Sequence, residues 1–340
     1  MPKKMLIDGI WHNDVEDTPA LREQRREEKR TWFRSWVGRG DTAMFEAEPG
    51  RYHLYVSYAG PWAHRTILYR RLKRLEGVIS MSVVHPKWAG PHGWEFGTTP
   101  FSTEDHLYGF RYLYETYQLA KRDFTGIVTV PVLFDRREGT IVNNESGEII
   151  RMLNSAFDAW GDASVDFYPP ALRAEIDRLS GVILSTVCSG VYAAGFASTQ
   201  QDYDRAVGRL FAALDELEQR LARQDYLLGR RVTESDWHLF ATLCRFDAAY
   251  HGPLKCNLRR LIDYPALAAY TKRLYELPGV AETVRFDHIK RHYYDAIPGI
   301  NHEIVAAGPA VQFTEARFGS AADAGVSDSG VGPASGVRAL

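Results

Sequence analysis

The chain has 340 residues, enough for one large domain or two of ordinary size. Its hydrophobic fraction of 45% and charged fraction of 25% are typical of a globular protein with a sizeable core. The formal net charge of −2 provides no basic field that would recruit nucleic acid or an anionic membrane, so both classes of partner are excluded.

Targeting signals and cysteine usage predict a cytoplasmic protein. The sequence has no run of about 18 apolar residues that would predict a transmembrane helix, and its N-terminus lacks the apolar stretch of a signal peptide. The three cysteines, Cys188, Cys244 and Cys256, are odd in number and widely spaced. This pattern argues against a disulfide framework and favours a reducing compartment.

Residues 1–45 are predicted to be an N-terminal extension. A charged run over residues 22–30 is followed by the aromatic residues Trp32, Phe33 and Trp36. Glutamates are interleaved with the arginines of this run, which argues against a nucleic-acid-binding arm. We therefore expect a solvated coil that its aromatic side chains attach to the body of the protein.

Residues 46–160 are predicted to form an α/β domain. Residues 52–59 alternate and are rich in aromatic and β-branched side chains, as in a strand. Pro61 suits the first turn of a helix, where its missing N–H would be unpaired, and helical spacing continues to Gly77. A second strand is expected at 79–84, which gives a strand–helix–strand unit.

The rest of this domain contains a long insertion and a second pair of strands. Residues 86–125 are rich in aromatic residues and glycine and are expected to be a functional loop. A strand is predicted at 127–134, but Pro131 removes a hydrogen-bond donor there and indicates an edge or a special turn. A short strand at 141–142 is followed by a helix that starts near residue 144.

Strand patterns end after residue 170, and an all-helical domain is predicted over residues 165–306. Four amphipathic helices are expected, at 171–187, 203–222, 235–250 and 265–276. The polar residues from Thr233 to Asp236 are a helix-start signal. The Ala-, Gly- and Ser-rich segment 307–340 is predicted to be disordered.

Seven segments in the same order resemble the Xi class of the glutathione transferase superfamily, the glutathionyl-hydroquinone reductases. They run from Gly60-Pro-Trp-Ala-His-Arg-Thr66 to His288-Ile-Lys-Arg-His-Tyr-Tyr294, and the five between them are 93–96, 128–133, 144–152, 190–197 and 254–257. The resemblance implies an α/β + all-α fold, with a thioredoxin-like N-terminal domain followed by an all-helical C-terminal domain of the glutathione-transferase type. It also implies a homodimer, a glutathione site on the first domain, and a pocket for a small aromatic substrate between the domains.

The resemblance places a thiol-ligand site in the first domain. Glu145 and Ser146 would hold the γ-glutamyl end, and the backbone N–H groups of a helix start do suit a carboxylate, while Glu145 can pair with an ammonium. Simple helix capping is the alternative reading of both residues. The backbone of Val130, just before a proline that is cis in thioredoxin-like folds, would pair with the cysteinyl residue. Trp94 would cover the ligand, or instead be a core anchor.

A second group of residues resembles the family's substrate pocket. Tyr192 and Tyr293 match its tyrosines, and phenols can donate a hydrogen bond or a proton to a quinone or phenolate oxygen. Arg245 is expected to point into the same cleft. The alternative is that both tyrosines only pack between helices. His288 and His292 have the i, i+4 spacing of zinc ligands, but no third ligand is apparent, so we expect no metal.

Two departures from the family pattern concern the thiol site. Gly60 stands where thiol enzymes of this fold carry the nucleophilic cysteine of a Cys-Pro-Trp motif, and glycine cannot form a mixed disulfide. Ile127 stands where the family pattern has an arginine that assists glutathione binding. Cys188, four residues before Tyr192, is either a displaced thiol that faces the pocket or a small core residue.

The sequence therefore predicts an enzyme of this family that acts on a quinone, hydroquinone or related aromatic without cysteine-dependent disulfide exchange. It would use bound glutathione, or another low-molecular-weight thiol, as the nucleophile. Alternatively, Tyr192 and Tyr293 would provide acid/base catalysis without any thiol. A non-catalytic protein that sequesters aromatic ligands is the alternative from another functional class.

Overall fold

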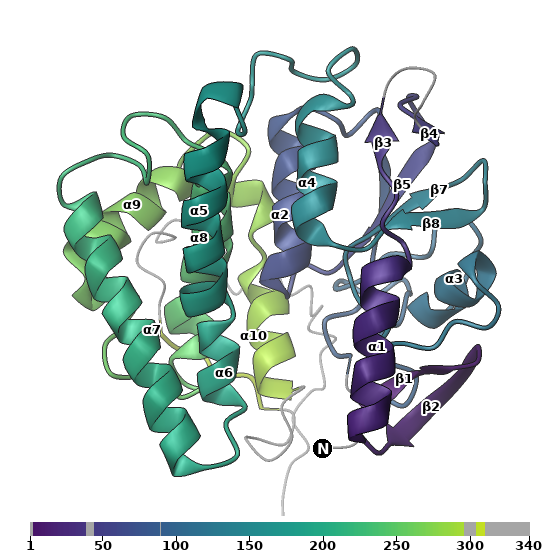
Figure 1. Ribbon diagram of the computed structural model, residues 1–340, viewed down its shortest axis with the longest axis horizontal. Coiled ribbons are helices and arrows are strands. Elements are labelled where there is room, and N and C mark those ends of the chain that lie inside the picture. Colours follow the sequence, from purple (N-terminus) through teal and green to yellow (C-terminus); the bar gives the residue numbers. More distant parts are fainter. Residues whose placement is uncertain (1–2, 39–43, 89, 296–303, 310–340) are drawn as a thin grey trace, which may run out of the picture.

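A computed structural model describes residues 3–38, 44–88, 90–295 and 304–309 of the chain (Figure 1). Strands lie in the first half of the chain, and all elements after residue 143 are helical. In Figure 1 the two halves stand side by side, with α2 and α4 next to the helices of the second half. Apart from residues 307–309, the predicted disordered tail lies outside the described residues.

A four-stranded sheet organises the first half, in the order β6-β5-β7-β8. Strand β5 (Tyr52–Val56) pairs in parallel with β6 (Ser80–Val83) and antiparallel with β7 (Val132–Asp135), which pairs antiparallel with β8 (Thr140–Asn143). Every residue of β5 is buried. Because side chains alternate along a strand, Leu54 enters one hydrophobic core and Tyr55 the other. Strand β7 begins only after Pro131, so the predicted strand 127–134 is shorter than expected.

Two helices flank this sheet at the positions that build the site. Helix α2 (Pro61–Leu72) follows β5, and α4 (Ser146–Ser155) follows β8. Both contribute side chains to the larger core, which continues into the helical half. The turn before α2, at Gly60, and the turn before α4, at Glu145, therefore lie close to the helical half.

The N-terminal extension is not the solvated coil predicted from its charges. It forms an antiparallel hairpin of β1 (Lys3–Ile7) and β2 (Ile10–Val15), followed by α1 (Pro19–Thr31). Arg, Glu, Gln and Lys are good helix formers, and the Thr18 hydroxyl accepts a hydrogen bond from the Leu21 amide at 3.2 Å. Leu6 and Gly126 exchange backbone hydrogen bonds, so the extension joins the first half. Strands β3 (Val37–Gly38) and β4 (Phe45–Glu46) form a short parallel pair.

The insertion at 86–125 is also more ordered than predicted, because it contains helix α3 (Leu113–Ala120). The Glu115 carboxylate accepts hydrogen bonds from the amides of Arg111 and Tyr112 at 2.9 and 2.7 Å. It thereby caps the helix start, where amides lack intrahelical partners. The density of aromatic residues in this segment obscured the short helical period.

The second half is helical, as predicted. Its α-helices are α5 (Arg173–Ile183), α6 (Gly190–Gly195), α7 (Gln200–Leu221), α8 (Glu234–Leu243), α9 (Pro265–Tyr275) and α10 (Phe286–Asp295). Wide π-type turns follow α5 and α8, at Leu184–Cys188 and Phe246–Tyr250, and single 3-10 turns lie at Pro170–Leu172, Leu261–Asp263 and Ala281–Thr283. The predicted helix 235–250 is therefore broken near Arg245.

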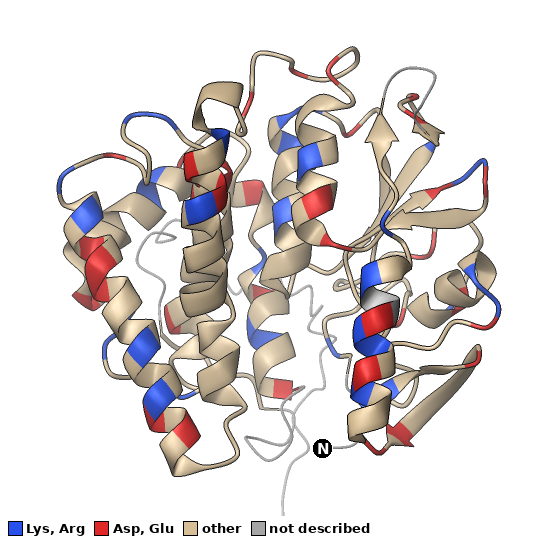
Figure 2. Ribbon diagram, viewed as in Figure 1, with Lys and Arg blue, Asp and Glu red and all other residues tan. Residues whose placement is uncertain are grey.

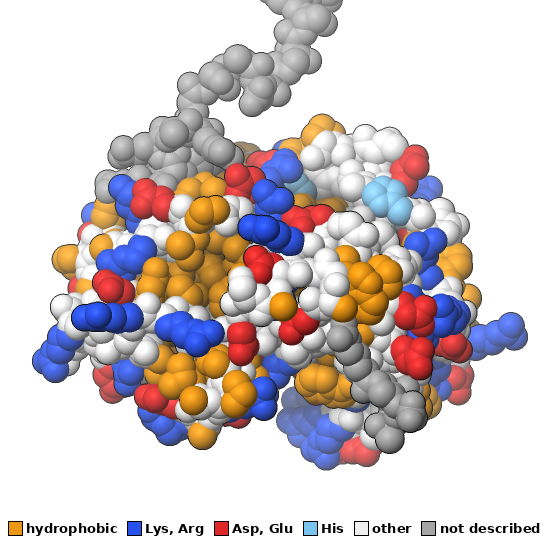
Figure 3. All heavy atoms as spheres, turned by 90° about the horizontal axis from the view of Figure 1, so that it is seen from above, with side chains coloured by type: hydrophobic (Ala, Val, Ile, Leu, Met, Phe, Trp, Pro, Cys, Tyr) orange, Lys and Arg blue, Asp and Glu red, His pale blue; other side chains and the backbone are white. Residues whose placement is uncertain are grey.

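Charges of both signs are spread over the elements rather than gathered by sign (Figure 2). Helix α1 carries both signs along its length. The face seen from above mixes acidic, basic and apolar side chains (Figure 3). No helix among the described residues is long and apolar enough to cross a membrane.

Candidate active site

The turn before α2 places Gly60 at an open helix N-terminus. Gly60 is the N-cap residue, and no side chain caps the helix. Its φ of −85° and ψ of 145° are accessible to any residue. Apart from the adjacent residues of the chain, no heavy atom of the described residues would lie within 4 Å of a Cβ at this position. Neither the backbone nor the packing therefore requires glycine, and the first-turn amides of α2 can stabilise an anion.

The segment facing this turn ends at the Val130–Pro131 peptide, which is cis as expected. Within the described residues, the Val130 amide and carbonyl have no hydrogen-bond partner. The neighbouring Thr129 carbonyl, by contrast, accepts a hydrogen bond from the Tyr117 hydroxyl at 2.9 Å. Val130 thus offers one free backbone donor and one free acceptor, which is what an extended peptide needs in order to pair with it.

The start of α4 provides polar groups of a second kind. The Ser146 side chain is buried, and its hydroxyl has no hydrogen-bond partner in the described part of the chain. Such an atom costs free energy unless a ligand or water satisfies it. The Glu145 carboxylate is half exposed and lies 3.9 Å from the Arg34 guanidinium. The arrangement fits a bound carboxylate at Ser146 and an ammonium at Glu145.

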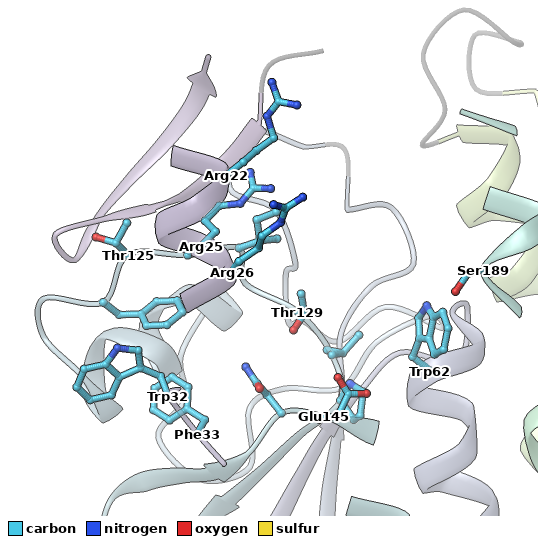
Figure 4. Close-up of a pocket in the computed structure, with 16 residues that line it drawn as sticks. Arg22, Arg25, Arg26, Trp32, Phe33, Trp62, Thr125, Thr129, Glu145 and Ser189 are labelled. Carbon is cyan, nitrogen blue, oxygen red and sulfur yellow. The ribbon is translucent and has the colours of Figure 1, made fainter. Parts of the chain in front are cut away.

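Of these residues, Val130 and Glu145 line a cavity of about 620 Å³ (Figure 4). Its lining comes from five parts of the chain: α1 with the two aromatic residues after it, the segment 124–131, the turn before α4, Trp62 of α2, and Ser189, which lies opposite Trp62. The apolar members are Trp32, Phe33, Trp62, Phe124, Ile127, Val130 and Pro131. Trp94 is not among the lining residues. It instead stacks on His292 of α10, with ring centroids 5.8 Å apart.

Three tyrosines meet beside this cavity. The Tyr192 and Tyr293 hydroxyls are 2.6 Å apart, and the Tyr250 hydroxyl is 3.3 Å from that of Tyr293. Trp62 stacks against Tyr192 at 6.5 Å, which joins the cluster to the turn at Gly60. Burial raises the pKa of Tyr192 and of Tyr250 well above that of an ordinary phenol. All three hydroxyls therefore stay protonated at neutral pH and can donate.

Tyr250 was not predicted as a site residue. It lies at the end of the predicted helix 235–250, where any of several residues could have faced the cleft. Only the π-type turn after Arg245 brings its hydroxyl to Tyr293. Nothing in the local sequence pattern indicates that turn.

Arg245 is fully buried and holds the backbone of the turn before Gly60. Its guanidinium donates to the carbonyl oxygens of Ala59 at 2.8 Å and Tyr58 at 2.9 Å. It also donates to Ala241 and contacts His64 Nδ1 at 3.0 Å. The expectation that it points into the substrate cleft is therefore replaced by a positioning role, because its donors are used by these backbone and ring atoms.

The remaining candidates lie in the core. Cys188 is fully buried, and its thiol donates to the His238 carbonyl at 3.3 Å, so it is a core residue rather than a displaced nucleophile. Burial raises its pKa further from that of a reactive thiolate. His292 Nδ1 lies 2.7 Å from the Pro86 carbonyl. The described residues contain no group of three His, Cys, Asp or Glu side chains that could hold a metal ion.

Comparison with known proteins agrees with this geometry. The family described as "Glutathione S-transferase, N-terminal domain" matches residues 59–156, and the corresponding C-terminal domain family matches 200–273. A glutathionyl-hydroquinone reductase of Escherichia coli K12 is 47% identical over 312 residues, covering 89% of this chain and 94% of that protein. The chain belongs to the glutathionyl-hydroquinone reductase family of glutathione transferases.

Solved structures of the family have the same fold. The Xi-class transferase from Natrialba magadii superimposes with a TM-score of 0.86 at 46% identity, covering 92% of this chain and 94% of that one. The glutathione-bound structure of a transferase homologue from E. coli K-12 gives 0.81 at 46% identity, covering 90% and 96%. The predicted thioredoxin-like domain followed by an all-helical domain is confirmed, and this reductase-family chain is an enzyme of that fold.

Proposed function

We propose that this enzyme acts on a quinone, hydroquinone or related small aromatic with glutathione as the thiol, and forms no enzyme-bound mixed disulfide. The observation that carries the proposal is Gly60. The open helix N-terminus is intact, but no cysteine stands there. All three cysteines of the chain are free and buried. The nucleophilic sulfur must therefore come from the ligand.

The polar groups at Val130 and at the start of α4 fit glutathione in one orientation. The γ-glutamyl carboxylate would meet the Ser146 hydroxyl and the first-turn amides of α4, with its ammonium at Glu145. The cysteinyl residue would pair with the Val130 backbone. The thiol would then lie toward the start of α2, where no described residue other than the chain neighbours of Gly60 comes within 4 Å of a Cβ at that position. A related thiol with the same γ-glutamyl-cysteinyl part would fit as well.

Glutathione supplies a thiolate sulfur when bound, and the residues of the chain would do the rest. First-turn amides of α2 favour the thiolate over the thiol. Trp62 and the tyrosine cluster supply aromatic faces next to the sulfur. Tyr192 and Tyr293 would donate hydrogen bonds to the oxygen of the aromatic substrate, and one of them would deliver the proton that the ring takes up.

Assembly and location follow the family expectation. We propose a homodimer, because the resembling proteins usually form one. Three reduced, buried cysteines support a reducing compartment such as the cytoplasm.

The decisive experiment is to incubate the protein with glutathionyl-menadione and excess glutathione and to follow menadiol and oxidised glutathione. Slow turnover that requires free glutathione, without glutathionylation of the protein in intact-mass spectra, would support the proposal. Turnover as fast as that of a cysteine-containing relative would contradict it. Binding of the aromatic without turnover under any thiol would favour the sequestering alternative.

Single substitutions separate the tyrosines from the rest of the fold. Tyr192→Phe and Tyr293→Phe each remove one hydroxyl and little volume, and each should lower turnover by about 100-fold, the lower end of the range for general acid catalysis. Tyr203→Phe is the matched control, since its hydroxyl bonds to the Lys255 carbonyl away from the cavity. Loss of activity in the control, or none in both site variants, would remove the tyrosines from the mechanism.

A further inference from the structure

One wall of the cavity is formed by α1, a helix with no role in the function proposed so far. Arg22, Arg25 and Arg26 all line the cavity. Their spacing of three and four residues places them on one face of the helix. Figure 4 shows all three side chains extending from α1 on the side of the cavity opposite Trp62.

These arginines differ in whether an acidic side chain of the protein already pairs with their charge. Arg25 pairs with Asp17 at 2.9 Å and is mostly buried. Arg26 makes only an exposed ion pair with Glu23 at 3.2 Å. Exposed ion pairs of this kind contribute little free energy, so the Glu23 carboxylate holds Arg26 only weakly. Arg22 has no ion-pair partner among the described residues. Among the residues of the structure that are described, Glu145 is the only acidic one that lines the cavity, so the α1 side is cationic.

The position of a bound peptide thiol brings its C-terminus to this side. A peptide that pairs with Val130 antiparallel runs in the direction opposite to the chain. If its γ-glutamyl end lies at Ser146, beyond Pro131, its C-terminal residue lies beside Ile127 and Thr129. Ile127 is 38% exposed and lines the cavity, but it carries no charge for a carboxylate. The neighbouring cationic groups are those of α1.

We propose that Arg22 and Arg26 of α1 bind the C-terminal carboxylate of the thiol peptide, so that the N-terminal extension completes the thiol site. This inference rests on the proposed function, because it assumes a γ-glutamyl-cysteinyl ligand. It assigns α1 as a specificity element that selects peptide thiols ending in a free carboxylate over neutral or shortened ones. Guanidinium–carboxylate hydrogen bonds are charge-assisted and suit this recognition.

The test compares two ligands and one double variant. Binding of glutathione and of its C-terminal amide is measured by calorimetry at low salt, for the wild-type protein and for Arg22→Gln/Arg26→Gln. We expect the wild type to bind the acid about tenfold more tightly than the amide, as two partly exposed charge-assisted bonds imply. The double variant should bind both ligands equally. Arg205→Gln/Arg209→Gln, which removes two exposed arginines of α7, is the charge-matched control and should keep the wild-type preference.

A rescue variant tests the geometry. Adding Ile127→Arg to the double variant puts a cation where the peptide should end, and it should restore the preference for the acid. A wild type that binds both ligands equally, or a double variant that still prefers the acid, would overturn the role of α1 and leave the proposed function intact. Binding of neither ligand by the wild type would overturn the choice of thiol, and with it both proposals.

Discussion

At the scale of single residues, Gly60 leaves the thiol-enzyme fold intact but removes the cysteine on which its usual thiol chemistry depends. The cysteine of a thiol enzyme at a helix N-terminus works because amides of the first turn stabilise its thiolate. In this chain those amides remain, the backbone angles are ordinary, and the space above the Cα is open. No other group of the described residues takes the place of the cysteine sulfur at position 60. Its loss therefore affects the reaction and not the folding of the protein.

Restoring the thiol should restore the exchange reaction. Gly60→Cys should fold like the wild type, form a mixed disulfide with glutathione, and reduce glutathionyl-menadione at least about 100-fold faster, since nucleophilic catalysis by a low-pKa thiol returns. Intact-mass spectrometry and a turnover assay measure both effects. Gly60→Ser fills the same space without a thiol and should stay at the wild-type rate. A folded Gly60→Cys protein that never becomes glutathionylated would show that the thiol site no longer accepts glutathione.

At the scale of elements, the turn before α2 depends on a residue far along the chain. The carbonyls of Tyr58 and Ala59 are held by Arg245, which begins the π-type turn after α8. The His64 ring lies between this guanidinium and the Thr283 hydroxyl, 2.9 Å away. The helical half thus fixes the orientation of the α2 N-terminus.

Removing this contact should destabilise the whole protein. Arg245→Met keeps most of the volume but leaves the carbonyls of Ala59 and Tyr58 buried without donors, so we expect the free energy of unfolding in urea to fall by about 3–5 kcal/mol. Arg273→Met is the control. Arg273 also donates to a carbonyl, that of Asp225 at 2.7 Å, but this hydrogen bond is exposed and the residue is only partly buried, so the expected loss is below about 1 kcal/mol. Equal losses in both variants would contradict the positioning role.

The elements that the sequence predicted are those with local signals. Pro61 and the spacing after it predicted α2, and the start of α8 was predicted from Thr233 and Asp236, which do form a capping box. Helix α1 was missed because its charges were weighed as solvation and not as helix propensity. The role of Arg245 could not be predicted at all, since its partners lie 186 and 187 residues away in the sequence.

At the scale of the whole molecule, the fold buries several histidines in the neutral form. The His53 side chain is fully buried between the Ser80 and Ser82 hydroxyls, at 2.7 and 2.9 Å. Burial lowers the pKa of His53 to about 3 and that of His238 to about 4. The pKa of His64 is also lowered, because burial and the neighbouring Arg245 both oppose a positive charge on its ring.

These shifts fix the sign of the pH dependence. An unfolded histidine has a pKa near 6.5. Because the folded pKa is lower, the folded protein binds fewer protons, and each histidine contributes stability that is complete above about pH 6.5 and is lost as the pH falls toward the folded pKa. We expect the free energy of unfolding to decrease between pH 7 and pH 5, by up to about 2 kcal/mol for each fully buried histidine.

A pair of variants isolates one of these contributions. His53→Gln removes a titrating group but keeps a polar side chain between the two serines, so its unfolding free energy should change less with pH than that of the wild type, by up to about 1.4 kcal/mol per pH unit. His12→Gln on the exposed face of β2 should leave the slope unchanged. Urea unfolding at pH 7, 6 and 5 measures all three proteins. Parallel pH profiles for His53→Gln and the wild type would mean that His53 does not titrate on unfolding, and the stability loss would then have to come from other groups.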